Sequence, residues 1–247
     1  MVLLWLWQRR SRNAAIVDVG WTAALGLLGG AYAVSLPGAV GRRWLIGGMV
    51  GIWSARLVAH LLRDRIVGQP EEGRYKALRD YWGDRAQPYL LLFFLGQAVL
   101  ACLLALAFVP GLVDTRPTFD GWDIAAAVLW IVAWSGETLA DRQLYAFKAD
   151  PANKGRVCDT GLWGWSRHPN YFFEWLMWIA FVLPGLPHPA GPYAVIAPLL
   201  MLILVVKVSG IPTSEKQCLR SRGDAYRAYQ RRVSPFLPLP PRKESSA

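Results

Sequence analysis

Residues 86–113, AQPYLLLFFLGQAVLACLLALAFVPGLV, contain no aspartate, glutamate, lysine or arginine. An apolar helix of roughly 20 residues crosses the hydrocarbon core of a bilayer, so this run predicts a transmembrane helix. The rest of the chain has a similar character, because hydrophobic residues make up 54% of it and 13 of its 247 residues are tryptophan. This composition is too apolar for one water-soluble domain of that size. A membrane must therefore solvate much of the protein.

Five further apolar segments surround this run. The two that precede it contain one charged residue each, Asp18 and Arg56. The last two are separated by the proline-rich turn 184–192, through which a helix does not continue. The six predicted spans are residues 13–40, 44–62, 86–113, 122–139, 171–186 and 192–208. The predicted fold is all-α and polytopic, with six to seven transmembrane helices, residues 1–7 forming a truncated or interfacial helix.

The C-terminal part of the chain is polar and basic. Residues 214–232 predict one or two amphipathic helices, broken near Gly223. By itself such a segment is also suited to lying on anionic lipid, and this interpretation stays open. We expect one transmembrane domain over residues 1–240 and disorder over residues 241–247.

The loop charges predict the orientation of the spans. Lysine and arginine gather in residues 9–12, in the loops 63–85 and 142–167, and in the tail after Lys207, which six helices bring to one side. The positive-inside bias makes that side cytoplasmic, with Arg42-Arg43 as a small exception. We therefore expect an integral protein of a bacterial inner membrane, with both termini in the cytoplasm. The net charge of +10 is mostly this topological signal, and no nucleic-acid module accompanies it.

The cysteines and histidines do not predict a metal site. They are few and far apart, without the spacing of metal ligands: Cys102, Cys158, Cys218, His60, His168 and His188. The expected partners are membrane lipid and a lipophilic small molecule from the bilayer, and the expected state is a monomer.

Five ionisable residues lie within the predicted spans or at their ends: Asp18, Arg56, Glu137, Asp141 and Glu174. A charged side chain inside a bilayer costs at least about 2.5 kcal/mol, so each needs a partner or a wet cavity. Simple pairing stays open for Asp18, which lies near the basic residues 9–12, and for Arg56, whose expected partner is an acid on a neighbouring helix.

Glu137 and Asp141 are four residues apart and share one face of a single helix. Two like charges stacked in this way repel, so a cation or the donor groups of a ligand should meet them. Neutralisation by Arg142, Lys148 or Arg156 is the alternative.

The stretch 161–174, GLWGWSRHPNYFFE, combines a glycine-containing loop with the proline that starts the next helix. It delivers Arg167 and His168 to a helix N-terminus, where free backbone donors attract anions such as phosphate. Asn170 and Glu174 then follow on one helical face. An anion site with hydrogen-bonding groups below it suits an elongated, charged cofactor. The alternative is a juxtamembrane loop in which Arg167 meets lipid phosphates and the tryptophans anchor the interface.

These motifs together resemble the steroid 5α-reductase family, in particular its uncharacterised bacterial branch. The resemblance rests on Gly161-Leu-Trp, Ser166-Arg-His-Pro-Asn-Tyr171, Glu174, Glu137-Thr-Leu-Ala-Asp-Arg-Gln143, Ser221-Arg-Gly-Asp-Ala-Tyr226-Arg-Ala-Tyr229, Asp18-Val-Gly-Trp21 and Glu72-Gly-Arg-Tyr75. It covers most of the chain. The Arg-His-Pro-Asn-Tyr element alone is less specific, since membrane isoprenylcysteine and phospholipid methyltransferases carry something similar.

The resemblance implies a membrane reductase that binds NADPH from the cytosolic side and reduces the C=C bond of a lipophilic α,β-unsaturated ketone. A shielded carboxyl group that keeps its proton could serve as the donor to the carbonyl, a role we assign to Asp18, with His60 as a weaker candidate. The Gln-Glu pair of the animal steroid enzymes is absent, so a steroid is not established as the substrate. The expected cofactor-binding residues are Glu137, Asp141, Lys148, Arg156, Arg167, His168, Asn170, Tyr171, Glu174, Arg222, Tyr226 and Tyr229.

Two other functions stay open. A membrane methyltransferase that uses S-adenosylmethionine should have a Glu-Glu pair before its C-terminal helix, and only Glu215 of such a pair is present here. A lipid-binding or scaffold protein without enzymatic activity would not need Glu174 for ligand binding.

Overall fold

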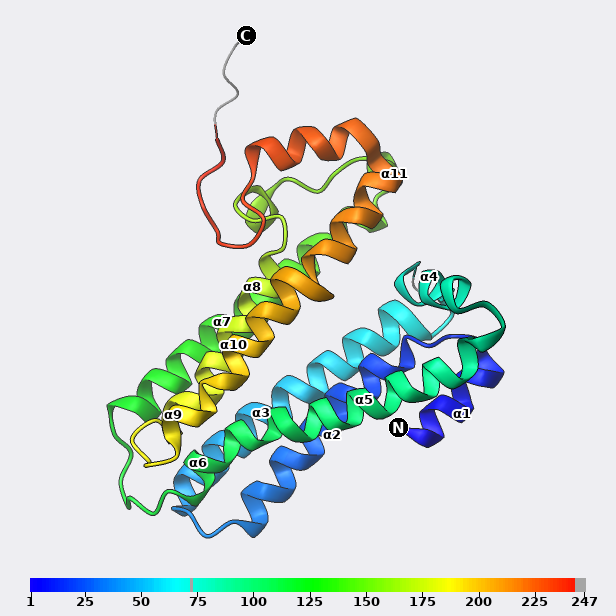
Figure 1. Ribbon diagram of the computed structural model, residues 1–247. Helices are drawn as coiled ribbons and strands as arrows, with labels where there is room; N and C mark the ends of the chain where they lie inside the picture. The colour runs from blue at the N-terminus through cyan, green and yellow to red at the C-terminus, as the bar shows by residue number, and fades with distance from the viewer. Residues whose placement is uncertain (72, 243–247) are drawn as a thin grey trace. The chain divides into compact units, whose positions relative to one another are not determined.

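The computed structural model of the chain describes residues 1–71 and 73–242 (Figure 1). Helices account for nearly all of the regular structure there, and the described residues form no strand, so the all-α prediction is confirmed. The contacts divide the chain into two compact units. The N-terminal unit comprises the described residues of Met1–Ile124 and Phe181–Val195, and the C-terminal unit those of Ala125–Ala180 and from Ile196 on. The single domain over residues 1–240 stays a prediction, and most of the expected disordered tail lies outside the described residues.

Five helical segments among the described residues are long and apolar enough to cross a membrane: Ile16–Ser35, Val40–Ile66, Gly73–Val113, Gly121–Ala149 and Gly191–Arg232. The chain is therefore a polytopic membrane protein. The remaining predicted span, residues 171–186, corresponds to α8 (Pro169–Val182), which has only 14 residues and continues into η6 (Leu183–Gly185). At 1.5 Å per residue α8 is about 21 Å long, shorter than the hydrocarbon core of about 30 Å.

The N-terminal unit packs α2 against α3 and α5. Its helices are α1 (Val2–Ser11), α2 (Ile16–Ser35), α3 (Val40–Leu61), η1 (Leu62–Ile66), α4 (Gly73–Trp82), η2 (Gly83–Arg85), α5 (Ala86–Ala105), η3 (Leu106–Phe108), α6 (Val109–Val113) and α9 (Gly191–Ala194). Phe181 stacks edge-on against Trp53 and Phe108, with ring centroids 5.6 Å apart in both pairs. The apolar start of the chain is helical, as expected, and at about 15 Å α1 is too short to span.

The C-terminal unit contains most of α7 (Gly121–Ala149) and α8, together with α10 (Ile196–Ile203), η7 (Leu204–Val208) and α11 (Ile211–Arg232). The short helices η4 (Pro151–Asn153) and η5 (Gly161–Gly164) lie in the loop between α7 and α8. A Cβ atom at Gly136 of α7 would lie 2.4 Å from Cε1 of Phe173 on α8, so these two helices pack closely. The predicted break in α11 is confirmed at Gly223, whose φ of 51° suits glycine.

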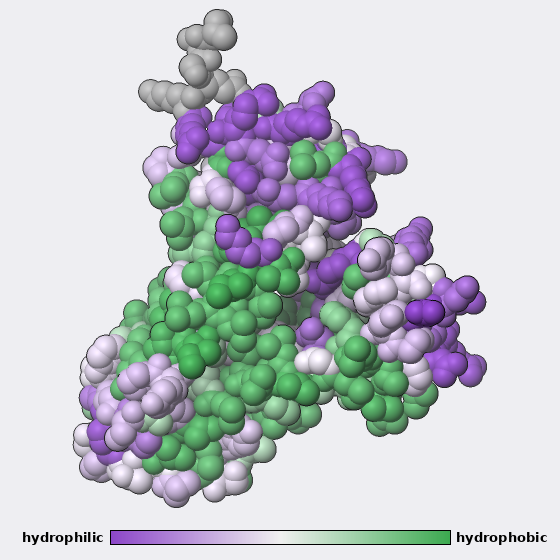
Figure 2. Space-filling model, viewed as in Figure 1, coloured by the Kyte–Doolittle hydropathy of each residue, from purple (hydrophilic) through white to green (hydrophobic). Residues whose placement is uncertain are grey.

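The surface of the C-terminal unit separates by polarity along its helices. Figure 2 shows hydrophilic residues gathered over α11 and hydrophobic residues over the long helices that lead to it. On α7, Val128, Ile131 and Val132 are all more than half exposed. Exposed aliphatic side chains in the middle of a long helix are expected where the solvent is lipid.

Candidate functional site

Four polar side chains of α7 and α8, which we call the polar column, lie together within the C-terminal unit. Glu137 and Asp141 come from α7, Asn170 and Glu174 from α8. Nδ2 of Asn170 lies 3.4 Å from Oδ1 of Asp141, a long hydrogen bond across the two helices. One turn farther along each helix, Glu137 is 4% exposed, and Glu174 accepts a hydrogen bond from Nε1 of Trp178 at 3.0 Å. The structure thus joins the two pairs that the sequence singled out separately.

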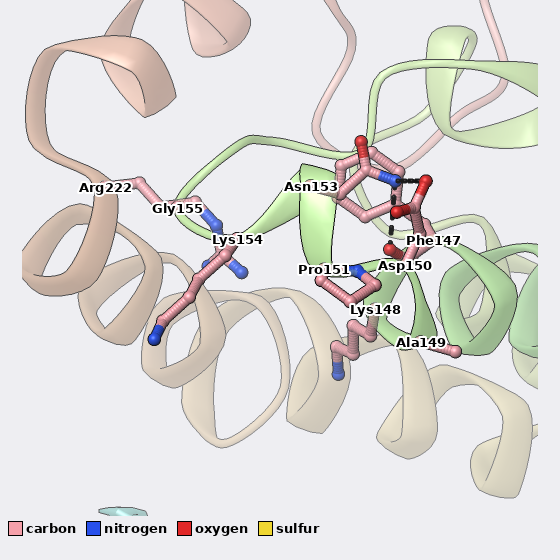
Figure 3. A pocket seen from close by; sticks show the side chains of 9 residues that line it. All are labelled: Phe147, Lys148, Ala149, Asp150, Pro151, Asn153, Lys154, Gly155 and Arg222. Atoms are coloured by element: carbon pink, nitrogen blue, oxygen red, sulfur yellow. Dashed lines mark hydrogen bonds between the residues drawn. The ribbon is translucent and has the colours of Figure 1, made fainter.

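A basic cleft of about 260 Å³ lies where α7 ends (Figure 3). The turn that forms it is fixed by Asn153, whose Nδ2 donates to the carbonyl of Phe147 at 3.1 Å. Three cations line this basic cleft, Lys148, Lys154 and Arg222. Nothing in the sequence marked Lys154 as a site residue; its position in the turn after α7 is the signal that could have identified it.

Lys148 connects the basic cleft to the polar column. It follows Asp141 by seven residues, two helical turns, and therefore lies on the same face of α7 as Asp141 and Glu137. The distance along the axis is about 10 Å. One helical face thus carries an ammonium group at the polar end of α7 and carboxylates nearer its middle.

Arg167 lies inside the C-terminal unit and not at the mouth of an anion site. It is 8% exposed, and its Nε donates to Oε1 of Glu215 at 2.6 Å. Its Nη1 donates to the carbonyls of Gln230 at 3.0 Å and Val233 at 2.6 Å. These contacts occupy the guanidinium that the sequence suggested for phosphate. The physical reason is the counter-charge of Glu215, which the loop sequence could not reveal.

His168 belongs to the same buried network. Its ring stacks on Tyr171, with centroids 5.3 Å apart and planes 6° from parallel. Nε2 lies 3.6 Å from Oε1 of Glu215, too far for a hydrogen bond. Burial lowers the pKa of His168 below the ordinary imidazole value, although Glu215 acts in the opposite direction. Tyr171 also joins α8 to α11, because its hydroxyl lies 2.9 Å from Oγ of Ser214.

The lowered pKa of His168 predicts a pH-dependent stability. Between the folded and unfolded pKa values the unfolded chain binds more protons, so the folded state loses stability as the pH falls below about 6.5. Replacement by glutamine removes that loss. We expect the melting temperature of the wild type to fall relative to that of His168→Gln when both are measured from pH 7 down to pH 5. A difference between the two proteins that stays constant over this range would contradict the assignment.

Tyr226 and Tyr229 face the interior of the C-terminal unit. Both are at most 3% exposed, and the hydroxyl of Tyr229 donates to the carbonyl of Trp163 at 2.6 Å. Arg222, before the break in α11, donates from Nε to the carbonyl of Arg156 at 2.8 Å. The two tyrosines thus hold the last part of α11 against the preceding loop, and their part in nucleotide binding stays a prediction. Arg222 lines the basic cleft, and Arg156 directly follows Gly155, another of its lining residues.

Asp18 is held by three donors within the N-terminal unit. Its Oδ1 accepts from the hydroxyl of Tyr75 at 2.6 Å, and its Oδ2 accepts from Arg65 at 2.8 Å and Arg74 at 2.9 Å. Two guanidinium groups and a hydroxyl thus surround this carboxylate, and the proton-donor role expected for Asp18 stays a prediction. The other candidate donor, His60, lies 3.7 Å from a carboxylate oxygen of Asp64.

Tyr75 is a polar residue whose role the sequence did not establish. It is 1% exposed and reaches Asp18 from 57 positions along the chain. The Gly73-Arg74-Tyr75 motif, which contributes two of the three donors to Asp18, is the signal that could have identified it.

Comparisons with known proteins place the chain in a family. The profile of the family described as "Protein of unknown function (DUF1295)" matches residues 4–233. An uncharacterised protein of Schizosaccharomyces pombe is 28% identical over 210 residues, which cover 76% of this chain and 60% of that protein. The chain therefore spans less than two thirds of the length of that relative. No solved structure matches the chain significantly. Because the family profile extends across both units, the chain belongs to the DUF1295 family.

Proposed function

We propose that the protein is a membrane-embedded oxidoreductase that uses NADPH to reduce the C=C bond of a lipophilic α,β-unsaturated ketone. The observation that carries this proposal is the polar column, four carboxylate and amide groups that continue from a basic cleft along α7 and α8. The resemblance of the motifs to the steroid 5α-reductase family supports the same reaction. The positive-inside bias puts the basic cleft in the cytoplasm, where NADPH is available.

The residues of the C-terminal unit fit this cofactor. Lys148, Lys154 and Arg222 offer the cationic donors that phosphate groups need. Farther along α7 and α8, Asp141 and Asn170 offer acceptors and donors for ribose hydroxyls and a carboxamide. When bound, NADPH supplies a hydride to the substrate.

The chain's own groups would bind the cofactor and the substrate, orient them and exclude water from the site. Glu137, which is 4% exposed, lies one helical turn from Asp141 on the same face of α7 and continues this set of acceptors. The lipid-exposed helices allow an apolar substrate to enter from the bilayer.

Ligand-dependent melting of the purified protein in detergent tests the cofactor. We expect NADPH to raise the melting temperature and S-adenosylmethionine to leave it unchanged, because a ligand stabilises only the state that binds it. The opposite result would favour the methyltransferase. No shift with either nucleotide would favour the lipid-binding or scaffold function.

Variants of the polar column test its part in binding. We expect Asn170→Ala and Glu174→Ala each to weaken NADPH binding at least about tenfold, or about 1.4 kcal/mol, and Lys148→Ala to weaken it as well. Lys216→Ala is the matched control, since Lys216 is an exposed lysine of the same unit outside the basic cleft. Unchanged affinity in both α8 variants would remove the polar column from the site.

A further inference from the structure

Two indole N–H groups of α7 are buried without an acceptor. Nε1 of Trp130 and Nε1 of Trp134 are shielded, and neither has a hydrogen-bond partner among the described residues. The two rings stack, with centroids 6.0 Å apart and planes 20° from parallel. A buried donor that lacks a partner destabilises the folded state, so this arrangement requires an explanation.

Other tryptophans of the same unit have acceptors. Nε1 of Trp163 donates to the carbonyl of Ala140, Nε1 of Trp175 to the carbonyl of Pro198, and Nε1 of Trp178 to Glu174, each at 3.0 Å. In the C-terminal unit, backbone carbonyls and a carboxylate thus accept the hydrogen bonds of these three indole N–H groups. Trp130 and Trp134 differ from these three because none of the described residues accepts a hydrogen bond from their Nε1 atoms.

The position of the two indoles excludes bulk water as the acceptor. Helix α7 has 29 residues and is about 44 Å long, more than the hydrocarbon core of about 30 Å. Its exposed Trp122 lies at one end and Lys148 at the other, so Trp130 and Trp134 lie near the middle of the span. The bilayer offers no water at that depth.

The two indoles also extend the polar column. Trp134 precedes Glu137 by three residues and Trp130 precedes Trp134 by four, so all three share one face of α7 with Asp141. The order along this face is ammonium, carboxylates and then aromatic donors. The face therefore becomes progressively less charged from the basic cleft toward the middle of the membrane.

We infer that Trp130 and Trp134 bind the carbonyl oxygen of a lipophilic ketone at the membrane-embedded end of the polar column. Stacked indoles offer flat apolar surfaces to a hydrocarbon skeleton. A carbonyl oxygen has two lone pairs, enough acceptor capacity for two N–H donors. The assignment of this site to the substrate of the reductase rests on the proposed function. The test of ketone binding is therefore carried out without nucleotide, so that its result does not depend on whether the protein binds NADPH.

The experiment compares a ketone with a hydrocarbon of the same shape. Radiolabelled cholest-4-en-3-one and cholest-4-ene are titrated onto the full-length protein in detergent. We expect the wild type to bind the ketone at least tenfold more tightly. Trp130→Phe/Trp134→Phe, which keeps two aromatic rings and removes both donors, should lose about tenfold in ketone affinity and retain its affinity for the hydrocarbon. Trp122→Phe, an exposed tryptophan of the same helix, should change neither affinity.

Two results would overturn the inference. One is equal binding of ketone and hydrocarbon by the wild type, a comparison that needs no variant and is therefore independent of folding defects. The other is an equal loss for both probes in the double variant, which would show that the rings only pack. If the ketone is bound selectively and the NADPH test fails, the site stands as a lipid-ketone site and the reductase proposal falls.

Discussion

Replacing Arg167 with methionine is expected to lower the free energy of unfolding of the C-terminal unit by about 3–5 kcal/mol, because a buried charge pair is broken from one side. Arg167 links three segments, donating to Glu215 early in α11, to Gln230 near its end and to Val233 after it. Methionine fills part of the volume and leaves these acceptors unmet. The melting temperature and the hydrogen exchange of the α11 amides measure the effect.

A matched lysine substitution separates structure from ligand binding. Lys148→Ala also removes one positive charge from this unit, but Lys148 is exposed, so the fold should stay within about 0.5 kcal/mol of the wild type. Arg167→Met/Glu215→Gln should recover part of the lost stability, because the remaining buried charge is then removed too. If Arg167→Met kept the wild-type melting temperature and only weakened nucleotide binding, the result would support the anion site that the sequence predicted at Arg167.

The all-helical membrane fold followed from the sequence because it depends on local properties. Uncharged runs such as residues 86–113 need lipid wherever they lie, and Gly223 interrupts α11 through its own backbone freedom. The length of α8 was predicted less well. Its helix ends at Val182 although the apolar residues continue, since Pro184 and Gly185 tighten the chain into η6.

The site was predictable to the extent that it depends on spacing within one helix. Asn170 and Glu174 are four apart, so their shared face was readable before any packing was known. The role of Arg167 was not readable, because its partner Glu215 lies 48 positions away. The environment of Asp18 likewise depends on Arg65, Arg74 and Tyr75, which reach it through tertiary packing. Long-range pairing determines which polar groups remain available for a ligand.

A similar long-range network explains the exception to the charge rule at Arg42. The side chain is 1% exposed and forms a bidentate pair with Asp123, from Nε to Oδ1 and from Nη2 to Oδ2, both at 2.8 Å. Nη1 also lies 3.3 Å from Oδ1 of Asp114. Two acids from later in the chain thus neutralise Arg42, so its charge does not oppose the orientation that the other loops predict.

Arg42→Met should therefore destabilise the N-terminal unit by about 3–5 kcal/mol, since it leaves Asp123 buried without its main cation, whereas Asp114 keeps Arg116 at 2.9 Å. The neighbouring Arg43→Met is the matched control, because Arg43 donates to backbone carbonyls, from Nε to Ala33 at 2.8 Å and from Nη2 to Val34 at 3.4 Å. We expect a clearly smaller fall in melting temperature for that variant. Equal falls would mean that the loss reflects hydrogen bonds at a helix end and not a buried charge. A double variant that also carries Asp123→Asn should regain stability relative to Arg42→Met, because the buried carboxylate that lost its cation is then neutral.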